Sequence, residues 1–257
     1  MKTRDRHNPQ SKIYRLFCGD LLRQAGAGIG GTISLPPGEV HHALHVLRLA
    51  IGDEVEIFDG MGCRCRGVIA SAGRSSVTVR IININDIPPR RRPAIHIGFA
   101  VPKGDRLDYL LEKATELAVA SIEPVVFERS VAGGQQLSPA ALARWQGQCI
   151  SAGKQAGVDF LPSIAQMKPL AEWLTDVTSP LRLMGDLSEE SRPLVQALPP
   201  HKPQSVHILV GPEGGIMPHE RQMAMAAGFL PVRVGCTTLR IETAVVAMLA
   251  VTGAAYG

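Results

Sequence analysis

The sequence lacks the cysteine patterns that hold secreted or zinc-binding domains together. Its five cysteines are odd in number and none are spaced as C-x-x-C, which argues against a disulfide framework and against a zinc ribbon. The longest apolar run, Ala244 to Val251, is far shorter than the roughly 20 residues that span a bilayer. Residues 1–12 are polar and contain no apolar core of a signal peptide. These absences predict a soluble, cytoplasmic protein with no membrane partner.

Two common nucleotide-binding motifs are also missing. The glycine-rich stretch Gly211 to Gly215 contains neither the GK[ST] of a P-loop nor the spacing G-x-G-x-x-G. An unrelated nucleotide-binding α/β enzyme therefore loses support as a hypothesis. His41, His42 and His45 include an i, i+4 pair, but no H-E-x-x-H motif and no neighbouring cysteine or carboxylate set accompanies them. We predict no metal there and favour a solvated or RNA-facing helix.

Glycine and proline are abundant, and charge is unevenly distributed. The chain has 26 Gly and 19 Pro in 257 residues, which is about 17% against an average near 12%. Residues 1–93 carry 14 basic and 8 acidic side chains, whereas residues 94–257 carry 13 and 15. The front of the chain is therefore at +6 and the rest at −2, within a total of +4. A basic front on a near-neutral body suggests a polyanionic partner.

A proline- and arginine-rich stretch, Pro88 to Pro93, predicts a boundary between two domains, because proline cannot donate a hydrogen bond inside a sheet. We place the domains at residues 1–88 and 94–257, with a linker at 89–93. Residues 1–88 contain short β-type runs between Gly, Pro and Asp turns and one helical segment at about 39–49, which indicates a small β-barrel-like module. The expected strands are Ile13 to Cys18, Val55 to Phe58, Arg64 to Ile69 and Ser76 to Ile82.

The second domain alternates buried strands with helices, a pattern typical of an α/β fold with a largely parallel sheet. Its compact apolar runs are Ile95 to Val101, Ile122 to Phe127, Leu181 to Met184, Val206 to Val210 and Leu230 to Val234. Helices are expected over Leu107 to Ala118, from the cap Ser138-Pro139 to a stop at Gly157, over Pro218 to Ala227 and over Glu242 to Ala255. The last is apolar nearly all round, as in a helix buried against a subunit interface.

Two loops follow strands of this domain and form the strongest candidates for a site. Gly211 to Gly215 lies between a buried strand and a helix, where glycine lets a ligand approach the backbone and helix amides can face an anion. A structural turn explains the same segment equally well. Val234 to Leu239 again follows a strand and leads into Arg240 and Glu242. Arg240 and Glu242 are two residues apart and cannot share a helix face, so we expect them to have different partners. Glu242 lies in the first turn of the helix, where a negative charge also interacts favourably with the helix dipole.

Taken together, these residues resemble the RsmE family, the 16S ribosomal RNA uridine-N3 methyltransferases. The resemblance extends over nearly the whole chain in order. In the front domain it rests on His42 with Val46-Leu47-Arg48, on Gly52-Asp53 and on Phe58-Asp59-Gly60. In the second domain it rests on Lys103 to Arg106, Lys113 to Leu117, Glu128 to Ser130, Arg144-Trp145, Gln155, Gly211 to Gly215, Leu239-Arg240 and Glu242 to Ala244.

The resemblance implies a PUA-like RNA-binding β-barrel domain followed by a SPOUT-type methyltransferase domain with a C-terminal trefoil knot. It implies S-adenosylmethionine as cofactor, 16S rRNA of the 30S subunit as substrate and a homodimer formed through the knot domain. From their position in the motif and the chemistry of N3 methylation, we expect Arg240 and Glu242 to be catalytic. Arg240 would stabilise the uracil anion, and Glu242 would accept the N3 proton or organise Arg240. The expected cofactor-binding residues are Leu183, Leu209, Gly211, Pro212, Glu213, Gly214, Gly215, Val234, Gly235, Thr238 and Leu239. The expected RNA-binding residues are Arg15, His42, Arg48, Arg64, Arg66, Lys103 and Arg106.

The sequence departs from the family pattern at a few positions. Lys154 stands before Gln155 where the family usually has Glu, and Val158 follows Gly157 where Arg is usual. Thr237-Thr238 and Ile241 also replace typical residues. An alternative function is therefore a catalytically weakened RNA-binding factor of the same fold.

Overall fold

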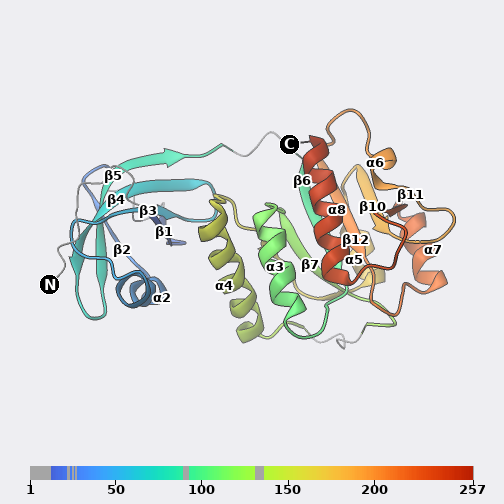
Figure 1. Cartoon of the computed structure of the whole chain (residues 1–257), viewed down its shortest axis with the longest axis horizontal. Helices are drawn as coiled ribbons and strands as arrows, with labels where there is room; N and C mark the ends of the chain where they lie inside the picture. The colour runs from blue at the N-terminus through green and yellow to red at the C-terminus, as the bar shows by residue number, and fades with distance from the viewer. Residues whose placement is uncertain are drawn as a thin grey trace. The chain divides into compact units, whose positions relative to one another are not determined.

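The computed structural model describes residues 13–21, 24, 26, 28–88, 93–130 and 136–256. The chain forms two compact units, Met1–Pro89 and Arg90–Gly257 (Figure 1). The linker expected at residues 89–93 lies outside the described residues except for Pro93, so the domain limits remain predictions. In the part that is described, no helix has both the length and the apolar character needed to cross a membrane.

The first unit is built on one sheet. Its strands are β1 (Tyr14–Phe17), β2 (Thr32–Ser34), β3 (Glu54–Phe58), β4 (Cys63–Ala72) and β5 (Val77–Asp86), in the spatial order β1-β3-β4-β5-β2. The β1–β3 pair is parallel and the other pairs are antiparallel. Alternate residues of β4 point to opposite faces, so Cys63, Cys65 and Ile69 enter the core while Arg66 is exposed.

Gly67 explains how β4 packs so closely on β5. A Cβ built at this position would lie 2.5 Å from Cγ1 of Val79 and 2.6 Å from the carbonyl oxygen of Arg80. The register also shifts between Arg66 and Gly67, which is the irregularity expected of a β-bulge at a glycine.

The helix expected at about 39–49 is shorter and split. The α-helix α2 (Pro37–His41) continues into the π-helical turn η1 (His42–Val46), and Arg48 then adopts a left-handed backbone with φ of 55°. That conformation is uncommon outside glycine and ends the helix. The strand β2 was not expected, because its three residues are too few to show alternation.

The second unit carries a sheet whose ladders are all parallel among the described strands. Its spatial order is β11-β13-β10-β12-β6-β7-β8, and β9 pairs with β7. The strands are β6 (Ala94–Phe99), β7 (Ser121–Val126), β8 (Ser163–Ile164), β9 (Lys168–Pro169), β10 (Leu181–Gly185), β11 (Arg192–Pro193), β12 (Ser205–Val210) and β13 (Leu230–Arg233). The five longer strands confirm the apolar runs predicted from the sequence.

Helices connect these strands, as the parallel order requires. They are α3 (Arg106–Glu116), α4 (Pro139–Ala156), α5 (Leu170–Asp176), α6 (Leu194–Ala197), α7 (Pro218–Ala226) and α8 (Ile241–Tyr256). The predicted limits of α4 are confirmed, since Ser138 Oγ accepts a hydrogen bond from Ala141 N and Gly157 ends the helix with φ of 73°. Helix α8 packs against α3, β6 and β12.

Candidate cofactor and active site

A cavity of about 320 Å³ opens at the carboxyl ends of β10, β12 and β13 in the second unit. In parallel α/β sheets, ligands bind outside these strand ends. The lining mixes glycines, apolar side chains and a few charges. It consists of Gly185, Asp186, Leu187, Val210, Gly211, Pro212, Glu213, Gly215, Ile216, Arg221, Val232, Arg233, Val234, Gly235, Thr237, Thr238, Leu239, Ile241, Ala244 and Met248.

The structure brings together the two loops that the sequence singled out. Of the eleven residues expected to bind cofactor, the cavity lining contains Gly211, Pro212, Glu213, Gly215, Val234, Gly235, Thr238 and Leu239. The other three lie elsewhere. Leu183 and Leu209 are fully buried in the core, and Gly214 instead presents its carbonyl oxygen to Arg129 Nη1 at 2.7 Å.

Sequence reasoning missed a third loop, which begins at Gly185 and Asp186 at the end of β10. The available signal was the apolar run that forms β10, because the residues after a parallel strand share the edge of the sheet with the other two loops. Arg221 on α7 was also missed; it lies one turn into a helix whose start was predicted correctly.

Glycine is required at position 211 in the wall of this cavity, and the space at position 185 is tight. A Cβ at Gly211 would lie 2.2 Å from Cγ1 of Ile216, a residue that also lines the cavity. A Cβ at Gly185 would lie 3.3 Å from Sδ of Met248. Because Gly185 and Gly211 line the cavity and carry no side chain, their backbone forms part of its wall.

One side of the cavity holds a fixed group of charges. Arg221 Nε lies 2.9 Å from Asp186 Oδ2, and its Nη2 donates to Ser188 Oγ at 2.9 Å and to Glu190 Oε2 at 2.7 Å. Burial alone would raise the pKa of Asp186, but hydrogen bonds from Ser188 and Arg221 outweigh it and hold that pKa below its usual value. Asp186 is therefore a carboxylate at neutral pH, oriented by its partners.

The start of α7 is tied to the loop after β7 through a buried carboxylate. Glu220 Oε1 accepts a hydrogen bond from Glu128 N at 2.8 Å, and its Oε2 accepts one from Met217 N at 3.0 Å. The side chain is only 5% exposed. These bonds position the helix that carries Arg221.

The two expected catalytic residues flank Ile241, which lines the cavity. Arg240 is exposed and immediately precedes α8, whereas Glu242 is 8% exposed in its first turn. Oε1 of Glu242 lies 4.0 Å from Arg106 Nε, and Arg106 Nη1 lies 3.3 Å from Glu213 Oε1. Within the described part of the chain, Oε2 of Glu242 is buried and has no hydrogen-bond partner. Arg106 thus lies between Glu213, which lines the cavity, and Glu242.

The RNA-binding candidates of the first unit differ in accessibility. Arg15 is the least accessible, because its side chain is 10% exposed, pairs with Glu56 Oε1 at 2.7 Å and lies 4.3 Å above the ring of Phe58. Arg64 also pairs with Glu56, at 3.6 Å. Arg48 is exposed on its left-handed turn.

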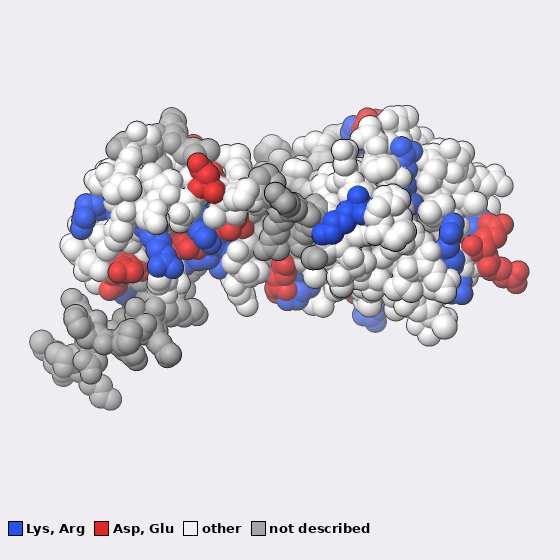
Figure 2. Space-filling model, turned by 90° about the horizontal axis from the view of Figure 1, so that it is seen from above, with Lys and Arg blue, Asp and Glu red and all other residues white. Residues whose placement is uncertain are grey.

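The remaining candidates are surface residues or lie near the surface. Arg66 is exposed and His42 is half-buried in the first unit, and Lys103 is exposed before α3 in the second. Arg90, Arg91 and Arg92, which extend the basic charge in sequence, lie outside the described residues. On the face shown in Figure 2, acidic side chains are interspersed among the basic ones.

Two further sequence expectations concern individual side chains. His41 and His45 are exposed, with ring centroids 4.9 Å apart. Val158, which stands where the family usually has arginine, is 5% exposed and follows the stop of α4. Val158 is therefore a packing residue in this chain, and Lys154 is half-buried on the same helix.

Comparison with known proteins connects this geometry to a family. The model of an RNA methyltransferase domain matches residues 89–253, and that of an RNA methyltransferase PUA domain matches residues 35–82. The first match covers more than half of the chain and contains the whole cavity.

Individual relatives cover almost the entire chain. A protein of Mycobacterium bovis named ribosomal RNA small subunit methyltransferase E is 29% identical over 247 residues, covering 94% of this chain and 92% of its own length. A protein of the same name from Neisseria gonorrhoeae, solved bound to S-adenosyl methionine, is 29% identical with a TM-score of 0.82, covering 93% of this chain and 96% of that one. A methyltransferase from Legionella pneumophila, solved with SAM, is 26% identical with a TM-score of 0.83, covering 95% and 98%.

Proposed function

This chain belongs to the family of RNA methyltransferases, and we propose that it uses S-adenosylmethionine to methylate N3 of a uridine in 16S ribosomal RNA. The observation that carries the proposal is the cavity at the carboxyl ends of β10, β12 and β13, which contains most of the residues expected to bind the cofactor. Full-length similarity to small-subunit rRNA methyltransferases supports the choice of substrate.

The cavity residues suit the proposed cofactor. Its volume of about 320 Å³ lies within the range of small-molecule sites. Glycine backbone at Gly211 and Gly235 allows close approach, while Ile216, Leu239 and Met248 provide an apolar surface. When bound, S-adenosylmethionine supplies an electrophilic methyl group on a sulfonium.

The reaction requires the acceptor nitrogen to lose its proton, because the uracil imide is a poor nucleophile until it does. Arg240 stabilises the resulting anion by charge-assisted hydrogen bonds. Glu242, whose Oε2 has no hydrogen-bond partner among the described residues, accepts the N3 proton or orients Arg240. Arg106, whose Nε lies 4.0 Å from the other oxygen of Glu242, places a positive charge beside that carboxylate.

The protein must also bind the RNA and expose the target uridine. The N3 edge of a uridine is normally paired or stacked, so the base has to leave the stack to reach the cavity. The first unit binds the RNA, and Arg48 is its strongest contact candidate because it is exposed on a left-handed turn. Binding then weakens steeply with salt, because phosphate contacts release counterions.

The resemblance described above supports further proposals about assembly. The C-terminal part of the second unit forms the trefoil knot of SPOUT enzymes, and two copies of the chain pack there as a homodimer. The substrate is the 30S subunit, and the enzyme acts in the cytoplasm, where that particle is found.

A methylation assay tests the proposal directly. Purified protein is incubated with labelled S-adenosylmethionine and unmodified 30S subunits or 16S rRNA, and the modified base is mapped. We expect N3-methyluridine at one position. Cofactor binding without product would instead favour the catalytically weakened RNA-binding factor.

Substitutions in the same assay separate the roles of the side chains. Arg240→Ala and Glu242→Gln should each lower kcat by about 100-fold or more, with little effect on cofactor affinity. The matched control is Lys168→Ala, which removes a positive charge at the ion pair with Asp176, outside the cavity lining. Wild-type turnover in Arg240→Ala would remove Arg240 from the mechanism.

A further inference from the structure

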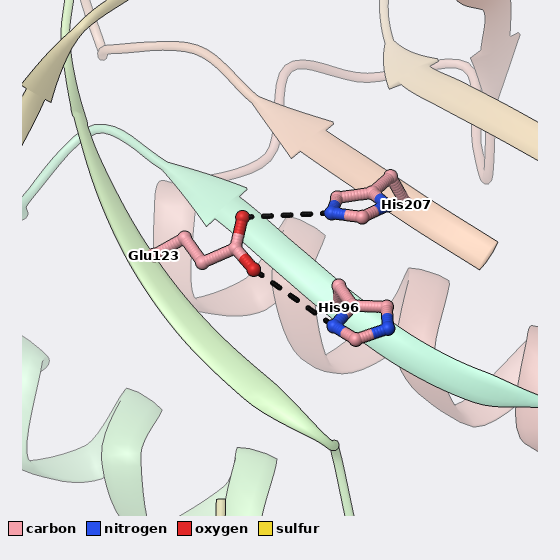
Figure 3. A group of neighbouring side chains, drawn as sticks. All are labelled: His96, Glu123 and His207. Carbon is pink, nitrogen blue, oxygen red and sulfur yellow. Dashed lines mark ion pairs between the residues drawn. The ribbon is translucent and has the colours of Figure 1, made fainter. Parts of the chain in front are cut away.

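A second cluster of chemically active side chains lies outside the cavity lining, on neighbouring strands of the second unit's sheet. His96 comes from β6, Glu123 from β7 and His207 from β12, and all three point toward one another (Figure 3). His96 and His207 are directly paired in the parallel register, and their rings stack with centroids 4.6 Å apart. One donor atom from each of the three residues lies within 4.8 Å of the others.

The carboxylate of Glu123 faces both imidazoles. Its Oε1 lies 3.8 Å from His96 Nδ1 and its Oε2 lies 3.5 Å from His207 Nε2. Both separations are longer than a good hydrogen bond. They are close to the distance of about 3.3 Å between two ligands of a tetrahedral ion that binds nitrogen and oxygen at about 2.0 Å. The donor set, two histidines and one glutamate, is one that zinc enzymes use.

Hydrogen bonds to His207 and Glu123 orient these two donors as the outer ligands of a metal site do. Ser179 Oγ lies 2.7 Å from His207 Nδ1, which leaves Nε2 directed at Glu123. Trp173 Nε1 donates to Glu123 Oε2 at 2.7 Å. Ser121 Oγ lies 2.7 Å from His96 Nδ1 and also donates to Glu123 Oε1, so this hydroxyl links two members of the cluster.

The exposure of the cluster also suits a metal. The side chains of His96, Glu123 and His207 are 25%, 16% and 9% exposed. The cluster is thus shielded but reachable from solvent, and a water molecule can complete a four-coordinate shell.

We propose that His96, Glu123 and His207 form a binding site for one divalent transition-metal ion, of which Zn²⁺ is the representative. The ion would join β6, β7 and β12, which are adjacent in the sheet. His96 and His207 sit in the first halves of their strands, whereas the cavity lies beyond the strands' carboxyl ends. The ion therefore stabilises the sheet and takes no part in methyl transfer.

The test uses the full-length protein, freed of metal by a chelator and titrated with Zn²⁺ in competition with a chromophoric chelator. We expect one Zn²⁺ per chain, and replacement by Co²⁺ should give the intense visible absorption of a four-coordinate site. Glu123→Gln and His207→Ala should each weaken Zn²⁺ binding by more than about 100-fold, and Ser179→Ala by about tenfold.

The matched control is the double variant His41→Ala/His45→Ala, which removes the exposed histidine pair of the first unit. It should bind Zn²⁺ as the wild type does. The proposal is overturned if the wild-type protein does not bind Zn²⁺ in the micromolar range, if its Co²⁺ complex shows only the pale spectrum of an octahedral ion, or if binding is lost in the His41/His45 variant instead. The wild-type measurements decide the matter even where a cluster variant fails to fold.

Discussion

Replacing the buried Glu220 should both destabilise the protein and weaken cofactor binding. Glu220→Ala removes the acceptors for Glu128 N at 2.8 Å and for Met217 N at 3.0 Å. A hydrogen bond to a charged group contributes about 1.5–3 kcal/mol. Two such bonds at a residue that is 5% exposed give an expected loss of roughly 3–6 kcal/mol in the free energy of unfolding.

Chemical and thermal unfolding measure this loss. For a unit of this size, each kcal/mol lowers Tm by about 2–4 °C, so Glu220→Ala should lower it by roughly 6–24 °C. Glu220→Gln keeps one acceptor oxygen and should lose about half as much. Because α7 also carries Arg221 into the cavity wall, the Kd for S-adenosylmethionine, measured by calorimetry below the transition, should rise as well.

Glu172→Ala provides the matched control, since this glutamate also begins a helix but its side chain is 60% exposed. Its loss should change the free energy of unfolding by no more than about 0.5 kcal/mol. A loss below about 1 kcal/mol for Glu220→Ala, with unchanged cofactor affinity, would refute the reasoning that this carboxylate holds α7 in place.

Three further changes test other parts of the structure. Gly98→Ala places a Cβ 2.4 Å from Cζ2 of Trp173 and should cost about 1–3 kcal/mol of stability in denaturant unfolding, whereas Gly147→Ala, which meets no atom within 4 Å, should cost nothing. The pKa of Asp186 in the folded protein lies below its usual value of 3.8. The ionised Asp186 therefore stabilises the fold above pH 3.8, and this stabilisation is lost as the pH falls through the folded pKa. Asp186→Asn should make the free energy of unfolding less dependent on pH in this acid range. Cys236 is exposed in a loop of the cavity, whereas burial raises the pKa of Cys65 to about 12 and that of Cys63 to about 11. A thiol reagent should therefore modify Cys236 first. Bound S-adenosylmethionine should slow that reaction.

Much of the second unit can be predicted from local sequence, because its strands are continuous apolar runs and its helices carry clear end signals. Ser138-Pro139 and Gly157 fixed α4 to the residue. Short elements such as β11 and α6 escaped prediction, because they are formed by sheet pairing and packing and not by local preference. The π-helical turn after α2 was not predicted either, because no local sequence preference marks it.

Site residues could likewise be predicted only where a local sequence signal marks them. Gly211 to Gly215 and Val234 to Leu239 could be predicted because a glycine-rich turn directly follows a buried strand. Leu183 and Leu209, also expected to bind the cofactor, are fully buried, and their role stays a prediction. The His96, Glu123 and His207 cluster had no sequence signal at all, because its members are far apart in the chain and only the strand order β12-β6-β7 brings them together.

The location of the cavity has a consequence for how the enzyme is made on the ribosome. Every lining residue falls between Gly185 and Met248, whereas the first compact unit is complete at Pro89. Domains fold as they emerge, at a synthesis rate of about 5–20 residues per second. The first unit therefore has on the order of 10 s to fold before the last residue that lines the cavity is added. A nascent chain can therefore fold its first unit well before it can bind a cofactor. A truncated product would keep the folded first unit but would lack the cofactor cavity.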